Sequence, residues 1–193
     1  MRIAALQMVS TPAIASNLAA AEKLIAQAAT QGAELVLLPE VFATLEGLSP
    51  LAEVAELDCA LTSESPRPIQ KVLSRCAKTY GLIIVGGTLP LVSRPDGSQI
   101  TDGRVRASCL VFGANGERLA RYDKIHLFDV KVNDAQSQYS ESLSYEAGSE
   151  LACVEVGEWQ LGLSVCYDLR FAELYRQLTA LGAQLVTVPA AFT

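Results

Sequence analysis

The residue with the greatest potential for covalent chemistry in this sequence is Cys166. It follows the apolar run of residues 161–165 and precedes a segment of helical periodicity, so its thiol is expected at a tight strand-to-helix turn. A helix N-terminus beside it would lower the pKa of the thiol and supply backbone N–H donors for an oxyanion. The alternative is a structural cysteine, because free cysteine is often buried as a small hydrophobic residue.

Glu40 and Lys124 are the charged residues whose positions suggest a role beside that thiol. Glu40 ends the apolar run of residues 35–39, and the carboxyl ends of parallel strands commonly open onto a ligand crevice. A carboxylate there could act as a general base. The ammonium of Lys124 could stabilise an oxyanion. Taken alone, each residue is more typical of a solvated surface charge.

His126 is the single histidine of the chain. Cysteine hydrolases often pair the thiol with an imidazole, so His126 defines a rival mechanism of the papain type. On an extended strand it would share a face with Lys124. We favour a structural, hydrogen-bonded histidine over a catalytic one.

Three segments of the sequence resemble, in order, the three signature regions of the nitrilase superfamily of carbon–nitrogen hydrolases. They are Leu-Leu-Pro-Glu at residues 37–40, Tyr-Asp-Lys-Ile-His-Leu-Phe-Asp at 122–129 and Val-Cys-Tyr-Asp-Leu-Arg-Phe-Ala-Glu-Leu at 165–174. The similarity covers residues 3–193. It implies that Glu40 is the general base, Lys124 the oxyanion stabiliser and Cys166 the nucleophile. It also implies a second active-site glutamate at Glu141. Two carboxylates in the site would raise the pKa of the thiol, against Lys124, and favour a neutral thiol hydrogen-bonded to Glu40.

The resemblance further implies hydrolysis of a small amide through a cysteine thioester, with release of ammonia and with no cofactor or metal. The backbone N–H of Tyr167 would complete the oxyanion site. Residues 124–130 and 139–142 are most similar to the branch of small-amide hydrolases that includes deaminated glutathione amidase and ω-amidase. Substrates of that branch carry a carboxylate, for which Arg170 is a candidate partner. Acyl transfer to another amine and an inactive interaction module are the alternative functions.

The elements that must position these residues can be expected from periodicity. Helices are predicted over residues 16–31, capped by Ser16 or Asn17, and over residues 68–80 and 169–181, each ending at a glycine. Strands are predicted over residues 2–9, 34–40, 82–87 and 184–188, with hairpins around Asn115-Gly116 and around residues 157–159. A polar surface loop is expected over residues 133–144. Strands alternating with helices indicate the α/β class.

The family resemblance sharpens this class to a four-layer αββα sandwich. We expect one domain over residues 1–193 that lacks the C-terminal portion of the sandwich. Members of the family associate through the helix after the cysteine. The stripe of Phe171, Leu174, Tyr175 and Leu178 therefore predicts a homodimer or a larger assembly, although the same stripe could belong to the core.

Composition excludes several other functions. The formal charge is −6 and the basic residues are scattered, which argues against nucleic-acid binding. No run of residues approaches the ~20 apolar residues that a membrane span needs. The five widely spaced cysteines contain no C-x-x-C pair and indicate neither a metal site nor a disulfide framework. A cytoplasmic location is the simplest expectation, because the N-terminus has no secretory signal pattern.

Overall fold

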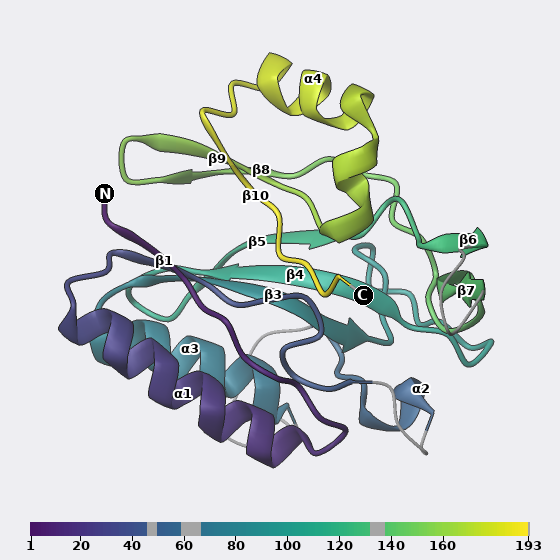
Figure 1. Ribbon diagram of the computed structural model, residues 1–193, viewed down its shortest axis with the longest axis horizontal. Coiled ribbons are helices and arrows are strands. Elements are labelled where there is room, and N and C mark those ends of the chain that lie inside the picture. Colours follow the sequence, from purple (N-terminus) through teal and green to yellow (C-terminus); the bar gives the residue numbers. More distant parts are fainter. Residues whose placement is uncertain (46–49, 59–66, 132–137, 193) are drawn as a thin grey trace.

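The computed structural model describes residues 1–45, 50–58, 67–131 and 138–192, arranged in four layers (Figure 1). Helices α1 (Ile14–Thr30) and α3 (Pro68–Tyr80) cover one face of a five-stranded sheet. A three-stranded sheet lies on the other face, and α4 (Ala172–Ala180) forms the outermost layer. The order helix, sheet, sheet, helix confirms the α/β class and the predicted αββα arrangement.

The larger sheet has the order β1-β2-β3-β4-β5. Its first three strands run parallel and its last two are antiparallel additions. The strands are β1 (Ile3–Ala5), β2 (Leu35–Leu37), β3 (Ile83–Leu91), β4 (Arg106–Phe112) and β5 (Arg118–Asp123). Strands β4 and β5 form the predicted hairpin, and Gly116 turns it with φ 83°. The parallel strands therefore end on the same side of the sheet, where β2 leads into Glu40.

The smaller sheet has the order β10-β9-β8. The predicted second hairpin joins β8 (Cys153–Val156) to β9 (Trp159–Leu163), and β10 (Leu185–Thr187) pairs parallel to β9. Strand β9 leads into the short 3-10 helix η2 (Cys166–Arg170). The nucleophile candidate therefore lies where this sheet meets the larger one.

Four short elements lie to one side of the sandwich (Figure 1). Strands β6 (Asp129–Lys131) and β7 (Gln138–Ser140) pair antiparallel and lead into the 3-10 helix η1 (Glu141–Leu143). Helix α2 (Leu51–Val54) is a single turn. The loop predicted over residues 133–144 thus contains a strand and a helical turn, and its residues 133–137 lie outside the described residues.

Two hydrophobic cores hold the layers together. One lies between α1, α3 and the larger sheet, and the other lies between the two sheets and α4. Strand β3 is buried along nearly its whole length, because both faces of the larger sheet are covered. Leu174 and Leu178 of α4 belong to the second core, so half of the stripe predicted for assembly is core. No helix among the described residues is long and apolar enough to span a membrane.

Two boundaries differ from expectation. Helix α1 begins at Ile14, ahead of the predicted caps, and the buried side chain of Asn17 bonds the loops at Thr11 and Ala43. The prediction that Ser16 or Asn17 caps this helix is wrong, because both lie inside it and the amide of Asn17 has partners that the local pattern does not show. The segment after Cys166 is a 3-10 turn, and the α-helix starts only at Ala172.

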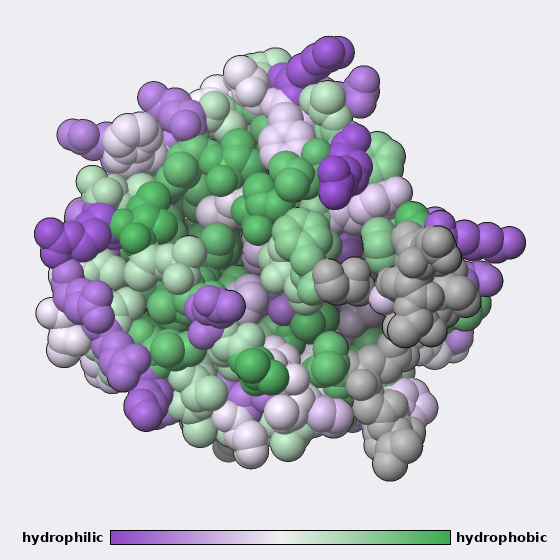
Figure 2. Space-filling view, viewed as in Figure 1, coloured by the Kyte–Doolittle hydropathy of each residue, from purple (hydrophilic) through white to green (hydrophobic). Residues whose placement is uncertain are grey.

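The face seen in Figure 2 carries apolar side chains across its middle, over the region where β1 and β10 lie in Figure 1. Both strands are edge strands of their sheets. Ile3 of β1 is exposed, and Leu185 and Val186 of β10 are partly exposed. The two sheets therefore both present apolar edges on the same side of the molecule.

Candidate active site

The structure brings Glu40, Lys124, Glu141 and Cys166 into one buried cluster. The Nζ of Lys124 donates to Oε1 of Glu40 at 2.8 Å and to Oε1 and Oε2 of Glu141 at 3.0 and 2.9 Å. Lys124 is only 2% exposed. One ammonium between two carboxylates leaves the cluster with a formal charge of −1 when all three groups are ionised.

Each carboxylate of the cluster is also fixed by a backbone donor. The N–H of Ala191 donates to Oε2 of Glu40 at 2.9 Å. The N–H of Phe128 donates to Oε2 of Glu141 at 2.6 Å. The Glu40 carboxylate thus contacts the segment after β10 as well as Lys124, and both acids are held in place before any ligand arrives.

Two glycines allow the backbone next to these side chains to pack closely. A Cβ added to Gly87 of β3 would lie 1.8 Å from the carbonyl oxygen of Pro39, the residue before Glu40. A Cβ added to Gly148 would lie 2.2 Å from the carbonyl oxygen of Asp123, the residue before Lys124. Larger side chains at either position would push the neighbouring acid or ammonium out of place.

Cys166 stands at a strained turn between β9 and η2. Its φ is 45°, a left-handed conformation that costs a non-glycine residue free energy and is typical of functional sites. The preceding Val165 is extended, and the N–H of Cys166 donates to the carbonyl of Pro189 at 2.9 Å. The residue lies where the sequence pattern predicted, although the turn leads into a 3-10 helix.

The pKa of the Cys166 thiol is raised to about 12. Burial is the largest cause, followed by the charge of Glu40 and a hydrogen bond with it, while Lys124 and the backbone of Ala191 act in the opposite direction. The raised pKa agrees with the expectation that carboxylates beside the thiol keep it neutral, against the lowering expected of a helix N-terminus. Burial and the Glu40 carboxylate together outweigh any effect of the short 3-10 turn that follows. Cys166 is therefore a neutral thiol at pH 7.

The pKa values of the Lys124 ammonium and of the Glu141 carboxyl are also shifted. Burial acts to lower the pKa of Lys124, but the charges of Glu40 and Glu141 and their hydrogen bonds outweigh it, so the pKa is raised. Burial raises the pKa of Glu141, against the opposing effect of Lys124 and of the Phe128 N–H. Lys124 thus stays charged in the neutral pH range and can act as an electrostatic donor.

The other two predicted site residues are Tyr167 and Arg170, and they lie in different surroundings. No described residue accepts a hydrogen bond from the backbone N–H of Tyr167, which directly follows Cys166. Arg170 is exposed, and no contact between it and the four clustered side chains is recorded. Its assignment to the substrate carboxylate remains a prediction.

His126 and Asp168 form a pair beside the cluster. Nδ1 of His126 lies 2.7 Å from Oδ1 of Asp168, and its ring stacks on Phe171 with centroids 3.6 Å apart. The imidazole is thus already engaged, as expected of a structural histidine. Sequence reasoning did not single out Asp168, although an acid two residues after the nucleophile, at the third position of a turn, is a detectable signal.

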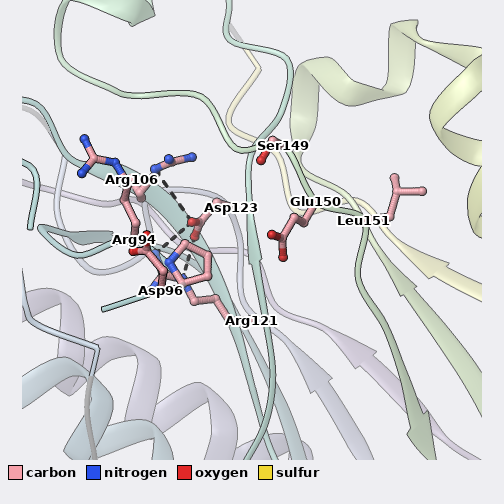
Figure 3. Close-up of a pocket in the computed structure, with 9 residues that line it drawn as sticks. Arg94, Asp96, Arg106, Arg121, Asp123, Ser149, Glu150 and Leu151 are labelled. Carbon is pink, nitrogen blue, oxygen red and sulfur yellow. Dashed lines mark hydrogen bonds and ion pairs between the residues drawn. The ribbon is translucent and has the colours of Figure 1, made fainter. Parts of the chain in front are cut away.

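A second polar feature is a cavity of about 230 Å³ between β4, β5 and residues 149–151 (Figure 3). Its arginines point toward acidic side chains rather than into free space. Arg121 pairs with Asp123 at 2.8 Å, and Arg94 pairs with Glu146 at 2.8 Å. The Arg121–Asp123 pair lies at the end of β5, immediately before Lys124. Within the described ranges, no group of three or more His, Cys, Asp or Glu side chains could hold a metal ion.

Comparison with known proteins identifies the class to which this fold and cluster belong. Residues 2–192 match the family described as carbon-nitrogen hydrolase, and the chain belongs to this family, as the resemblance to the nitrilase superfamily predicted.

Individual members of the family show which named proteins this chain is similar to. The chain is 41% identical, over 98% of its length, to a protein named deaminated glutathione amidase from Synechocystis sp., of which it covers 66%. It is 36% identical, over 99% of its length, to a protein named omega-amidase from Danio rerio, of which it covers 63%. A solved amidase from Nesterenkonia sp., a Glu-to-Gln variant with acrylamide added to its active-site cysteine, shares 29% identity and a TM-score of 0.77. That match covers 100% of this chain and 67% of the amidase.

Proposed function

We propose that this chain carries the active site of an amidase that cleaves the carbon–nitrogen bond of a small amide through a cysteine thioester. The observation that carries the proposal is the buried Lys124 ammonium, held by Glu40 and Glu141 beside a neutral thiol at a strained turn. The arrangement supplies a nucleophile, a base and an oxyanion donor without further groups.

The proposed reaction begins when Sγ of Cys166 attacks the carbonyl carbon of the amide. Its proton passes to Glu40, and the oxyanion binds Lys124 and the N–H of Tyr167. The tetrahedral species collapses to a thioester as the proton on Glu40 moves to the leaving nitrogen and ammonia departs. A water molecule then gives a proton to Glu40 and attacks the thioester. Collapse of the second tetrahedral species returns that proton to sulfur and releases the carboxylic acid.

The raised pKa of Cys166 fits this sequence of steps. A thiol with a pKa of about 12 supplies almost no thiolate at pH 7, so attack requires a base that removes the proton as the bond forms. Glu40 is that base because it acts directly on the thiol through its charge and a hydrogen bond. At pH 7 the thiol should therefore react best with an electrophile placed between it and Lys124, where Glu40 can take the proton as the bond forms.

The proposed substrate is a small amide that carries a carboxylate, by analogy with the deaminated glutathione amidase of Synechocystis sp.. Omega-amidase activity is the second candidate, because the relative from Danio rerio carries that name at similar coverage. Arg170 is retained as a proposed partner of the substrate carboxylate, since its exposed position leaves it available to a ligand.

A homodimer and a cytoplasmic location complete the proposal. The turn before α4 exposes Leu169, which supports an interface there, whereas Tyr175 is partly buried against the second core. The cysteines at 76, 109, 153 and 166 are free, as is common in a reducing compartment. Sedimentation at micromolar concentration should show a dimer, and a monodisperse monomer would contradict this part of the proposal.

Ammonia release from deaminated glutathione and from a panel of short ω-amides tests the activity, with product masses to separate hydrolysis from acyl transfer. Cys166→Ala should abolish release. Cys109→Ala is the matched control, because Cys109 is a buried cysteine of β4 outside the cluster. A folded chain that releases no ammonia from any of these amides, or a Cys166→Ala variant as active as the unmodified chain, would refute the proposal.

A further inference from the structure

Asp168 is fully buried, at 0% exposed, and its carboxylate accepts hydrogen bonds from four groups. Oδ2 accepts from the Tyr122 hydroxyl at 2.7 Å and from the Val165 N–H at 2.8 Å. Oδ1 accepts from the N–H and from the ring Nδ1 of His126, at 3.0 and 2.7 Å. These bonds compensate the burial of the carboxylate. Because a carboxylate only accepts, Nδ1 is the protonated ring nitrogen.

The four donors lie on the two segments that carry the proposed nucleophile and the ammonium. Tyr122 is two residues before Lys124 and His126 is two residues after it, while Val165 immediately precedes Cys166. One carboxylate therefore ties the end of β5 to the turn after β9. These segments belong to different sheets, so Asp168 fixes their relative placement.

The same side chain supports the strained conformation of Cys166. The Val165 N–H donates to the Asp168 carboxylate, and the Asp168 N–H donates back to the Val165 carbonyl at 3.0 Å. This reciprocal pair encloses Cys166, whose φ of 45° needs such support from its surroundings.

We propose that Asp168 is a positioning residue that holds Cys166 and Lys124 in the relative placement needed for attack on an amide carbonyl. The inference rests on the proposed function. Asp168 acts through Val165, Tyr122 and His126 rather than on the reacting atoms. Its effect should be large, because a displacement of about 1 Å at a reacting centre can cost about 10²-fold in rate.

Two variants separate the geometry of Asp168 from its charge. Asp168→Asn keeps the size of the side chain, removes the charge and leaves two of the four donors facing an amide NH₂. Asp168→Glu keeps the charge but displaces the carboxylate by one methylene. Both should lower kcat for amide hydrolysis by about 10²-fold with KM changed less than about threefold, as expected when orientation rather than binding is lost.

The pH dependence of iodoacetamide alkylation at Cys166 is the second readout. A thiol displaced from Glu40 loses part of the effect that raises its pKa, so both variants should be alkylated several-fold faster at pH 9 while amide turnover falls. Glu56→Gln is the matched control. Glu56 is also buried and accepts a backbone N–H, from Ile69 at 2.7 Å, but is recorded in no contact with the cluster. It should lower thermal stability without changing the alkylation profile.

Alkylation needs no amide turnover, so it tests the role of Asp168 even if the unmodified chain releases no ammonia. The proposal is overturned if folded Asp168→Asn and Asp168→Glu keep kcat within about threefold, or if kcat falls while the alkylation profile stays unchanged. If both variants fail to fold, Tyr122→Phe decides the question, because it removes one donor and leaves the charge. A smaller fall in kcat together with a smaller rise in Cys166 alkylation supports the proposal. If neither kcat nor the alkylation profile of Tyr122→Phe changes, the proposal is overturned.

Discussion

The replacement Glu40→Gln should have opposite effects on two reactions of Cys166. Glu40 raises the pKa of this thiol through its charge and a hydrogen bond, after the larger effect of burial. Glutamine is nearly the same size but carries no charge and is not a base. The variant should therefore lose amide hydrolysis, which needs proton removal at the moment of attack. It should gain simple alkylation, which needs only a pre-formed thiolate.

The size of both effects can be worked out. A unit charge at about 4 Å contributes about 4 kcal/mol at an effective dielectric constant of about 20, equivalent to about 3 pKa units at most. A fall of about 1 to 3 units from about 12 raises the thiolate fraction at pH 9 by about 10- to 500-fold. A thiolate of lower pKa is a weaker nucleophile, which cancels about half of the logarithmic gain. Alkylation should therefore accelerate about 3- to 30-fold, while loss of the general base should lower kcat by about 10² to 10⁴.

The assay is iodoacetamide alkylation at pH 9 followed by peptide mapping, which reads each cysteine separately. Cys109 is an internal control, because burial alone raises its pKa to about 12 and Glu40 is not among the causes. Its alkylation should be equally slow in both proteins. If Cys166 were alkylated in Glu40→Gln no faster than in the unmodified chain, the assigned contact between Glu40 and the thiol would be wrong.

Three other predictions follow from contacts described above. His126→Asn should keep kcat within about tenfold, since the imidazole is bonded to Asp168, and a loss as large as that of Cys166→Ala would favour the papain-type mechanism. Gly87→Ala and Gly148→Ala should lower kcat more than a surface Gly97→Ala control, because their Cβ atoms would meet the carbonyls before Glu40 and Lys124. Burial raises the pKa of Glu56, so its contribution to the unfolding free energy is complete below its unfolded pKa and is lost as pH rises through the folded value. Urea unfolding at pH 4 and pH 7 should then show a smaller advantage of the unmodified chain over Glu56→Gln at pH 7, and an equal difference at both values would contradict the direction of the shift.

Elements that begin or end at a proline, a glycine or a turn dipeptide could be predicted from the sequence. Helix α3 has the predicted bounds, because Pro68 opens it and Gly81 ends it with φ 62°. The β4–β5 hairpin follows from Asn115-Gly116 in the same way. The position of Cys166 just after a strand could also be predicted, since the apolar run before it ends there.

Features that depend on distant partners could not be predicted. The N-terminus of α3 is bonded by Glu56, which lies on another segment and has no capping pattern relative to Pro68. Asn17 resembles a local cap but bonds Ala43 across the fold. These contacts are set by tertiary packing, which residue spacing does not encode.

The close packing at Gly87 and Gly148 has a consequence for how mutations are distributed over this chain. Neither residue has a side chain that could do chemistry, yet each leaves room for a carbonyl that a methyl group would displace. In a saturation library selected for amide hydrolysis, both positions should therefore accept as few substitutions as the acid, the ammonium and the thiol. A functional map built from tolerance alone would place two inert residues inside the active site, and only the backbone geometry explains their presence there.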